Sequence, residues 1–322
     1  MPNPVLVEIM RGSLVESVHR GSVAVADTSG KIVFALGELE RPVYPRSSLK
    51  PIQALPLVES GAADAFGLGD EEVALACASH SGEPMHTTRV AAWLARIGCD
   101  ESDLACGGYP SRYEPVAEDM IKRGEKPTRI FNDCSGKHAG FLTVARHWDI
   151  ATKGYELHHH PVQRAIAKTL AELTGIESEF PWGVDGCAAP NFAVPLAAQA
   201  RALAQLSGAR GKRIVRAMTA NPELVSGTGR SCAILMRSCQ GRAAVKTGAE
   251  GSFAGIVPEL GHGIAIKIDD GAGRAADTAM AAMLEKYGLL GVDEAARNIL
   301  RAPITNTVGT VVGERRAVKV LQ

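Results

Sequence analysis

Residues 22–36 read SVAVADTSGKIVFAL, and this stretch sets the fold class. Two short apolar runs, rich in valine and isoleucine, are separated by the turn-forming residues Thr28-Ser29-Gly30. That pattern is typical of two antiparallel strands joined by a hairpin turn. LVEI at residues 6–9 precedes them and also has strand character. We therefore predict that the chain begins with antiparallel sheet.

The middle of the chain has a different periodicity. From about residue 47 to residue 225, apolar residues recur at spacings of three and four, which predicts amphipathic helices. These helices are expected at residues 49–61, 90–98, 114–124, 138–148, 162–175 and 195–208, several of them ending at a glycine. Later strands are expected at residues 232–238, 242–248 and 263–269, then a helix at 275–288 and a last strand near 307–313.

Strands at both chain ends around a long helical insert predict an α+β fold. We expect one antiparallel sheet, built from both chain ends, that packs with a helical lobe. Residues 1–322 would form a single catalytic domain with a sheet lobe (1–46 and 230–322) and a helical lobe (47–229). The active cleft would lie between the two lobes.

Composition excludes several classes of protein. Thirty-five Lys and Arg residues balance thirty-five Asp and Glu residues, so the chain lacks the basic excess of a nucleic-acid-binding protein. No segment reaches the roughly 18 uncharged apolar residues of a membrane span. Prolines and charges interrupt the N-terminal segment, which does not resemble a signal peptide. Together with an odd number of cysteines, seven, this predicts a cytoplasmic protein with reduced thiols.

The first candidate catalytic element is S-x-x-K at Ser47 and Lys50, where the strand pattern gives way to a helical one. Residues three apart share a face of one helical turn, so the Lys50 amine can reach the Ser47 hydroxyl. A neutral, desolvated lysine can then activate a serine as a nucleophile. Pro51 disfavours helical dihedral angles at Lys50, so we expect the turn to be distorted. S-x-x-K also occurs by chance in many chains.

The second element is Val245-Lys246-Thr247-Gly248, at the end of a predicted strand. Lys-Thr-Gly after a late strand, following S-x-x-K in an early helix, is the motif order of serine β-lactamases and penicillin-binding proteins. Between the two lies Cys77-Ala78-Ser79-His80-Ser81, where Ser79 takes the place of the serine in the S-D-N element and Ser81 replaces its asparagine. The alternatives are a solvated strand end at Lys246 and a helix C-terminus at Ser79.

The third element is Cys134-Ser135-Gly136-Lys137-His138, followed some fifty residues later by Asp185-Gly186-Cys187. Two thiolates and a nitrogen donor suit tetrahedral zinc with an open fourth position. Buried structural cysteines are the common alternative. The run of three histidines at residues 158–160 is interpreted as a loop before a helix.

Five motifs together strongly resemble the rhizobial-type, or class 3, L-asparaginases. They are RSSLKP (46–51), CASHSGE (77–83), FNDCSGKHAGF (131–141), VDGCAAP (184–190) and VKTGAEG (245–251). The resemblance covers almost the whole chain. It implies a fold similar to serine β-lactamases and glutaminases, a homodimer, and hydrolysis of L-asparagine to L-aspartate and ammonia.

The resemblance also implies roles for individual residues. The catalytic residues would be two Ser-Lys pairs drawn from Ser47, Lys50, Ser79 and Lys246, with Ser47 as nucleophile and Lys50 as its base. One Zn²⁺ per chain would be bound by Cys134, Lys137 and Cys187 and would position the substrate. Arg46, His138 and Asp185 would contact the substrate.

Other functions remain compatible with these motifs. Another acyl-transfer enzyme on the same fold, such as a glutaminase or a β-lactam-reactive hydrolase, would use similar Ser-Lys chemistry. A non-enzymatic amino-acid-binding protein stabilised by zinc would bind the ligand without releasing ammonia.

Overall fold

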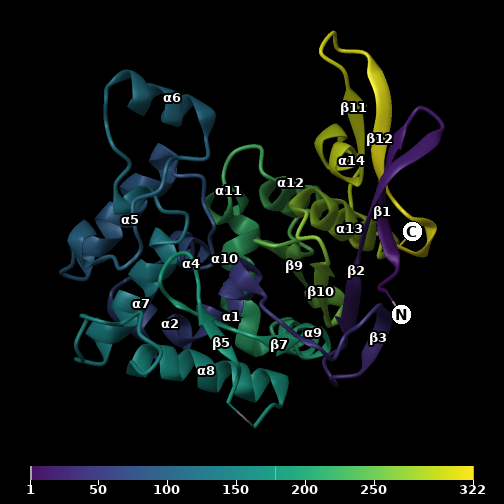
Figure 1. Ribbon diagram of the computed structural model, residues 1–322. Coiled ribbons are helices and arrows are strands. Elements are labelled where there is room, and N and C mark those ends of the chain that lie inside the picture. The colour runs from purple at the N-terminus through teal and green to yellow at the C-terminus, as the bar shows by residue number, and fades with distance from the viewer. Residues whose placement is uncertain (1, 178, 322) are drawn as a thin grey trace. The chain divides into compact units, whose positions relative to one another are not determined.

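A computed structural model describes residues 2–177 and 179–321 (Figure 1). The chain forms two compact units. The sheet unit consists of Met1–Ser48, Val194–Ala209 and Ile234–Gln322, and the helical unit consists of Leu49–Ala193 and Arg210–Ala233.

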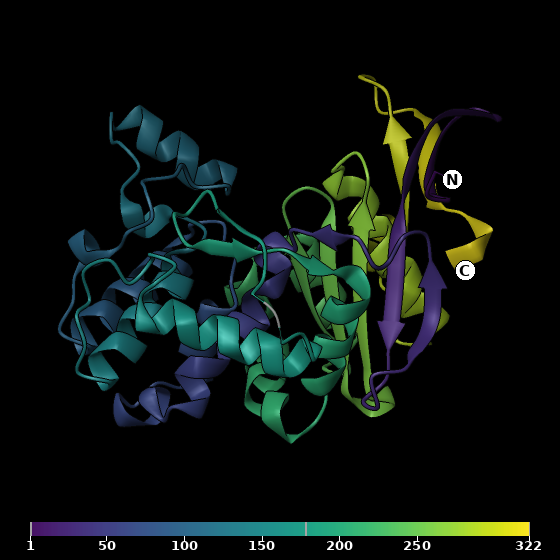
Figure 2. The same cartoon turned by 60° about the horizontal axis from the view of Figure 1, so that its bottom comes forward.

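The sheet unit is built on an antiparallel sheet in the order β11-β12-β1-β2-β10-β9-β8, with β3 also paired to β2. Strand β2 (Leu14–Ala26) is long enough to pair with three other strands. Its first half pairs with β1, and its second half pairs with β10 and β3 (Figure 2). The sheet therefore combines strands from both ends of the chain, and the predicted α+β class is confirmed.

Helices α9 (Leu196–Gln205) and α13 (Gly273–Lys286) cover opposite faces of this sheet. A Cβ atom at Gly263 would lie 2.2 Å from the Ala200 carbonyl oxygen of α9, and one at Gly255 would lie 3.3 Å from the Met280 sulfur of α13. Gly255 pairs with Ile264, the residue after Gly263, and successive residues of a strand point to opposite faces. With both faces covered, all six residues of β9 are buried.

The remaining strands and helices of the sheet unit are two to seven residues long. They are β1 (Val5–Arg11), β3 (Ile32–Leu36), β4 (Pro42–Val43), β7 (Val194–Pro195), β8 (Ala244–Gly248), β9 (Ser252–Val257), β10 (His262–Ile268), α14 (Glu294–Leu300), β11 (Arg301–Thr305) and β12 (Val311–Ala317).

The helical unit has α7 (Ser135–His147) at its centre, and residues 135–145 of this helix are all buried. It packs against α4 (Asp70–Ala76), among other helices. A Cβ atom at Gly136 would lie only 2.4 Å from the Leu75 carbonyl oxygen, so a glycine is needed where the two helices meet. This close approach brings the end of α4 to the start of α7.

The remaining elements of the helical unit surround this pair. They are α1 (Lys50–Gln53), α2 (Leu55–Glu59), α3 (Ala62–Ala65), α5 (Pro84–Arg96), α6 (Glu114–Lys122), α8 (Pro161–Thr174), β5 (Trp182–Val184), β6 (Pro190–Phe192), α10 (Lys212–Ala220) and α11 (Pro222–Val225).

One strand prediction was wrong, and another was displaced by a few residues. Residues 232–238 lie in helix α12 (Ser231–Ser238), because a short apolar run has no periodicity that separates a buried strand from a buried helix. Residues 307–313 mostly form the turn between β11 and β12 and enter β12 only at Val311. The lobe boundaries stay a prediction, although α9, predicted in the helical lobe, belongs to the sheet unit.

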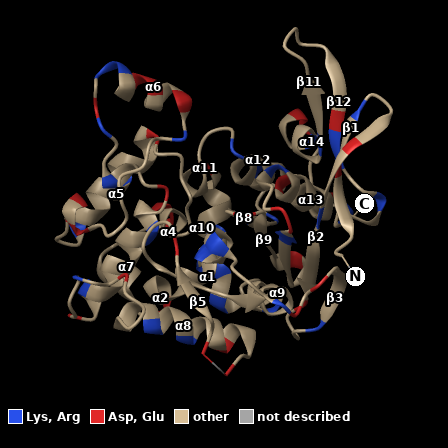
Figure 3. Ribbon diagram, viewed as in Figure 1, with Lys and Arg blue, Asp and Glu red and all other residues tan. Residues whose placement is uncertain are grey.

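Charges of both signs are distributed over the helices and strands (Figure 3). Helix α6, for example, carries acidic residues as well as a lysine. In the described part of the chain, no helix combines the length and apolar character that a membrane crossing requires.

Candidate active site

Lys50 is the central buried amine of the helical unit. It opens α1 and is 1% exposed. Its Nζ donates hydrogen bonds to the Ser79 hydroxyl at 3.0 Å, to the Cys134 sulfur at 3.1 Å and to the Ala78 carbonyl oxygen. The structure therefore brings a lysine of the first motif to the serine of the second and a cysteine of the third.

Ser79 lies in an irregular segment after α4 and is 4% exposed. Its backbone N–H donates to the Val225 carbonyl oxygen at 2.9 Å, and the next N–H, of His80, donates to the Asp133 carbonyl oxygen at 3.1 Å. The His80 imidazole hydrogen-bonds the Ser135 hydroxyl at 2.9 Å. Burial holds the pKa of His80 well below its ordinary value, so the ring is neutral.

Ser47 lies in the sheet unit, in a 3₁₀ turn (Arg46–Leu49) that directly precedes α1. Arg46, at the start of the turn, has a positive φ of 52°, which is uncommon for a residue other than glycine. The Ser48 N–H donates to the Pro45 carbonyl oxygen at 3.2 Å. The S-x-x-K motif thus begins as a tighter 3₁₀ helix, although Lys50, the residue at which Pro51 was expected to disfavour helix, is itself the first residue of α1.

The Lys-Thr-Gly motif lies beside this turn within the sheet unit. Lys246, in β8, is 1% exposed, and its Nζ donates to the Thr247 carbonyl oxygen at 2.7 Å. A Cβ atom at Gly248 would lie 2.6 Å from the Pro45 carbonyl oxygen and 2.9 Å from the Ser48 nitrogen. The motif's glycine is therefore required by contact with the serine turn.

The thiols of the third motif come from two different elements of the helical unit. Cys134 caps the start of α7, and Lys137 lies one turn along that helix. Cys187 lies in the turn between β5 and β6, which is closed by a hydrogen bond from the Asp185 N–H to the Ala189 carbonyl oxygen at 2.9 Å. Lys137 Nζ donates to Cys187 Sγ at 3.0 Å.

Cys134, Lys137 and Cys187 shift one another's pKa values. A hydrogen bond from Cys134 lowers the pKa of Cys187 well below its ordinary value, and the Lys137 ammonium lowers it further. The same bond raises the pKa of Cys134. Burial lowers the pKa of Lys137, but interactions with the Cys187 thiolate and, less strongly, with Cys134 outweigh it and raise that pKa. The cluster thus favours a thiolate on Cys187 and a cation on Lys137.

Zinc in proteins takes sulfur and nitrogen ligands, so the donor types of Cys134, Lys137 and Cys187 suit the ion, provided that Lys137 gives up its proton when the ion binds. The neighbouring His138 has a buried Nε2 with no hydrogen-bond partner in the described part of the chain. Within residues 2–177 and 179–321, no three His, Cys, Asp or Glu side chains are grouped as a metal site. A zinc site here therefore depends on the lysine amine as a third donor.

Three neighbours of the site were missed by sequence reasoning. Tyr155 hydrogen-bonds His138 Nδ1 at 2.7 Å, and Arg112 pairs with Asp133 at 3.0 Å. Burial favours the neutral form of Asp133, but the positive charges of Lys50 and Arg112 outweigh it and lower the pKa of this carboxyl. Asp133 directly precedes Cys134 in its motif and could have been noticed, whereas no pattern marks Arg112 or Tyr155.

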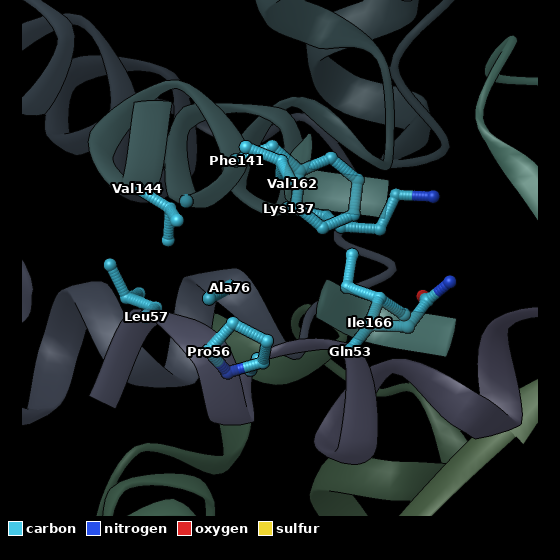
Figure 4. Close-up of a pocket in the computed structure, with 11 residues that line it drawn as sticks. Gln53, Pro56, Leu57, Ala76, Lys137, Phe141, Val144, Val162 and Ile166 are labelled. Carbon is cyan, nitrogen blue, oxygen red and sulfur yellow. The ribbon is translucent and has the colours of Figure 1, made fainter. Parts of the chain in front are cut away.

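A small cavity lies behind Lys137 (Figure 4). Phe141 and Val144 of α7 line it together with Pro56 and Leu57 of α2. Its volume of about 10 Å³ is room for about one water molecule. This apolar cavity is therefore too small to be the substrate site.

The ten predicted site residues divide between the units. The sheet unit holds Arg46, Ser47 and Lys246. The helical unit holds the other seven, which gather around Lys50 and around Cys187.

Comparison with known families gives one match over nearly the whole chain. A family model described as L-asparaginase II matches residues 7–317. No curated protein matches the chain significantly.

Comparison with solved structures gives more distant similarities. The native form of Mglu has a TM-score of 0.50 and 12% sequence identity, over 85% of this chain and 66% of that chain. A candidate beta-lactamase from Bacteroides dorei has a TM-score of 0.41 and 13% identity, over 78% of this chain and 87% of that chain. The likeness to Mglu shows a shared fold.

Proposed function

The chain belongs to the L-asparaginase II family, and from that premise we propose that it hydrolyses L-asparagine to L-aspartate and ammonia. Family membership makes it an amidohydrolase that acts on a small molecule. The observation that carries the proposal is the buried Lys50 amine, 3.0 Å from the Ser79 hydroxyl. An amide carbon is a poor electrophile, so its hydrolysis needs an activated hydroxyl and an acid for the departing ammonia.

The proposed reaction has two halves. The Ser47 oxygen attacks the side-chain amide carbon of asparagine while the Lys50 amine, in its neutral form, takes the hydroxyl proton. The carbon–nitrogen bond then breaks, and this proton leaves with ammonia, so that an aspartyl ester of serine remains. Water attacks the ester carbon, the serine oxygen recovers a proton, and aspartate departs. Ser79 and Lys246 relay protons, a role that the Lys50–Ser79 hydrogen bond supports.

Three side chains are proposed to recognise the amino-acid part of the substrate. Arg46 would bind its carboxylate through a bidentate pair, and Asp185 would bind its ammonium group. His138, held by its hydrogen bond to Tyr155, would line the same pocket. These roles come from the family resemblance.

Zinc is proposed as a bound ion that positions the substrate. Cys134, Lys137 and Cys187 would hold it, since their sulfur and nitrogen donors suit the ion. When bound, the ion would supply a Lewis-acidic centre that can orient a substrate oxygen. The proposed proton transfers above do not pass through it.

A coupled ammonia assay on purified protein tests the proposal. We expect ammonia from L-asparagine at a rate much higher than from L-glutamine, and no hydrolysis of nitrocefin. Equal rates on the two amides would reject asparagine specificity. Thermal stabilisation by asparagine without any ammonia release would instead indicate an amino-acid-binding protein.

The proposal extends to the state of the protein. We propose a homodimer that is cytoplasmic and in which each chain is one two-lobed catalytic domain. Light scattering during size-exclusion chromatography tests the dimer, because a mass of one chain would contradict it.

A further inference from the structure

We infer that Glu83 is a positioning residue that fixes Ser79 for the reaction, an inference that rests on the proposed function. It does so by tying residues 77–83, here the Ser79 segment, to residues 225–229, here the Thr228 loop. Both stretches belong to the helical unit. Neither Glu83 nor Thr228 was among the predicted site residues.

The Ser79 segment depends on individual hydrogen bonds for its position. Helix α4 ends before it and α5 begins after it, and residues 78–83 lie in neither helix nor strand. All of them are buried. A segment without a backbone ladder is placed only by the specific partners of its polar groups.

Glu83 supplies a charged partner. It is 4% exposed, and its carboxylate accepts three hydrogen bonds. Oε1 accepts from the Ser81 hydroxyl at 2.6 Å and from the Thr228 N–H at 2.9 Å, and Oε2 accepts from the Thr228 hydroxyl at 2.6 Å. Bonds to an ionised acceptor are about twice as strong as neutral ones. One side chain thus joins both stretches.

The Ser79 segment and the Thr228 loop contact each other at three successive points. At one end, the Ser79 N–H donates to the Val225 carbonyl oxygen at 2.9 Å. In the middle, a Cβ atom at Gly227 would lie 1.8 Å from the Ser81 hydroxyl oxygen, so only a glycine fits. The Glu83–Thr228 contact closes the other end. The Ser79 backbone is therefore held by a loop whose far end is fastened by Glu83.

A purely structural role would not call for a charged group here. Burying a carboxylate is costly, and apolar side chains of similar volume often hold a fold as well or better. The group that the Ser79 segment carries is the hydroxyl 3.0 Å from Lys50 Nζ. Misplacing a reacting group by about 1 Å can cost about 100-fold in rate. The geometry points to Glu83 as the residue that keeps this distance.

Substitutions at Thr228 test the inference with little risk to folding, because this residue is exposed. Thr228→Val removes the hydroxyl that bonds Glu83, and Thr228→Ser keeps it. Thr88→Val is the matched control, since Thr88 is exposed and its hydroxyl bonds only the Pro84 carbonyl oxygen within α5. Glu83→Gln keeps the size of the side chain but turns one acceptor into a donor.

For L-asparagine, we expect Thr228→Val to lower kcat by about 10- to 100-fold with KM within about threefold of the parent value. Thr228→Ser and Thr88→Val should stay near the parent, and Glu83→Gln should lose at least as much kcat as Thr228→Val. Hydrogen exchange of a peptide covering the Ser79 segment should speed up in Thr228→Val and in Glu83→Gln but not in Thr88→Val.

Two results would overturn the inference. One is a kcat within twofold of the parent in both Thr228→Val and Glu83→Gln. The other is a loss of kcat that Thr228→Ser shares. If the unsubstituted protein releases no ammonia, the proposed function fails instead. Hydrogen exchange then tests the Glu83–Thr228 contact without an activity assay, and unchanged exchange in both Thr228→Val and Glu83→Gln would reject its positioning role.

Discussion

The interiors of the two units are held in different ways. In the sheet unit, β9 is buried along its whole length and is paired on one side with β8 and on the other with β10. In the helical unit, the Ser79 segment is equally buried but has no ladder, and polar side chains such as Glu83 place it. Backbone ladders tolerate changes of side chain, whereas a segment held by side chains is sensitive to each of them. The second arrangement is the one that surrounds Lys50.

The largest effect is expected from substitutions that test which unit supplies the nucleophile. Ser47 lies in the sheet unit and Ser79 lies in the helical unit. Ser47→Ala should lower kcat on L-asparagine by about 10³-fold or more, because removing one member of a catalytic unit disables the rest. Ser79→Ala should lower it less. Ammonia release measures both, and near-normal activity in Ser47→Ala together with an inactive Ser79→Ala would reverse the two roles.

A second test compares a thiol of the helical unit with one of the sheet unit. Cys187→Ser should reduce bound zinc from about one ion per chain to nearly none, because a hydroxyl is a poor substitute for a thiolate ligand. Cys239→Ser, in the buried part of the sheet unit, should keep its zinc. Elemental analysis after purification without chelator decides. Full zinc in Cys187→Ser, or none in the unsubstituted protein, would return these cysteines to a structural role.

A smaller effect, on stability, is expected from alanine substitutions at two glycines of α7. A Cβ atom at Gly136 would lie 2.4 Å from the Leu75 carbonyl oxygen, whereas one at Gly140 meets its nearest neighbour, Ala76, at an ordinary 3.5 Å. Gly136→Ala should lower the free energy of unfolding by about 1–3 kcal/mol through overpacking. Gly140→Ala, beside the small cavity, should raise it by up to about 1 kcal/mol because alanine favours helix. Urea unfolding curves measure both, and equal stability of the two variants would contradict the close helix crossing.

The smallest effect concerns the exposed end of α4, away from the Ser79 segment. A hydrogen bond from Arg216 lowers the pKa of Asp70, so the pair stabilises the fold above the unfolded-state pKa and loses this effect as the pH falls through the folded-state value. Because Arg216 is exposed and solvent screens the pair, its coupling should be small at pH 7. A double-mutant cycle with Asp70→Asn and Arg216→Ala at pH 7 and pH 3 measures it. Coupling that grows on acidification would contradict the assigned ion pair.

Much of the sheet was predictable because strand propensity and turn chemistry are local. Residues 31–37 and 263–269 were expected as strands, and β3 and β10 occupy them. The strand over 252–257 was missed because its residues, buried on both faces, show no alternation. Residues 232–238 were misassigned for the same reason, since a buried helix also lacks a polar face.

The candidate site was predictable only where a motif carries it. The S-x-x-K, Lys-Thr-Gly and cysteine motifs drew attention to Lys50, Lys246 and Cys134, and the structure adds the contact of Lys50 with Ser79. Glu83 stood at the end of a motif without a role, because its partner Thr228 lies 145 residues away. Such pairings arise from tertiary packing and leave no periodic signal in the sequence.

The pairing of β1 with β12 has a consequence for synthesis on the ribosome. Arg11 pairs with Gly313, so at about 5–20 residues per second β1 waits roughly 15–60 s for its partner strand. Well before β12 is made, the first 193 residues, which include most of the helical unit, have been synthesised. The helical unit therefore has time to collapse first, while the long-range strand pairing must come late and is intrinsically slow. Pulse proteolysis of nascent chains arrested before residue 311 should find α7 protected and β1, whose partner strand β12 has not yet been made, still open to cleavage.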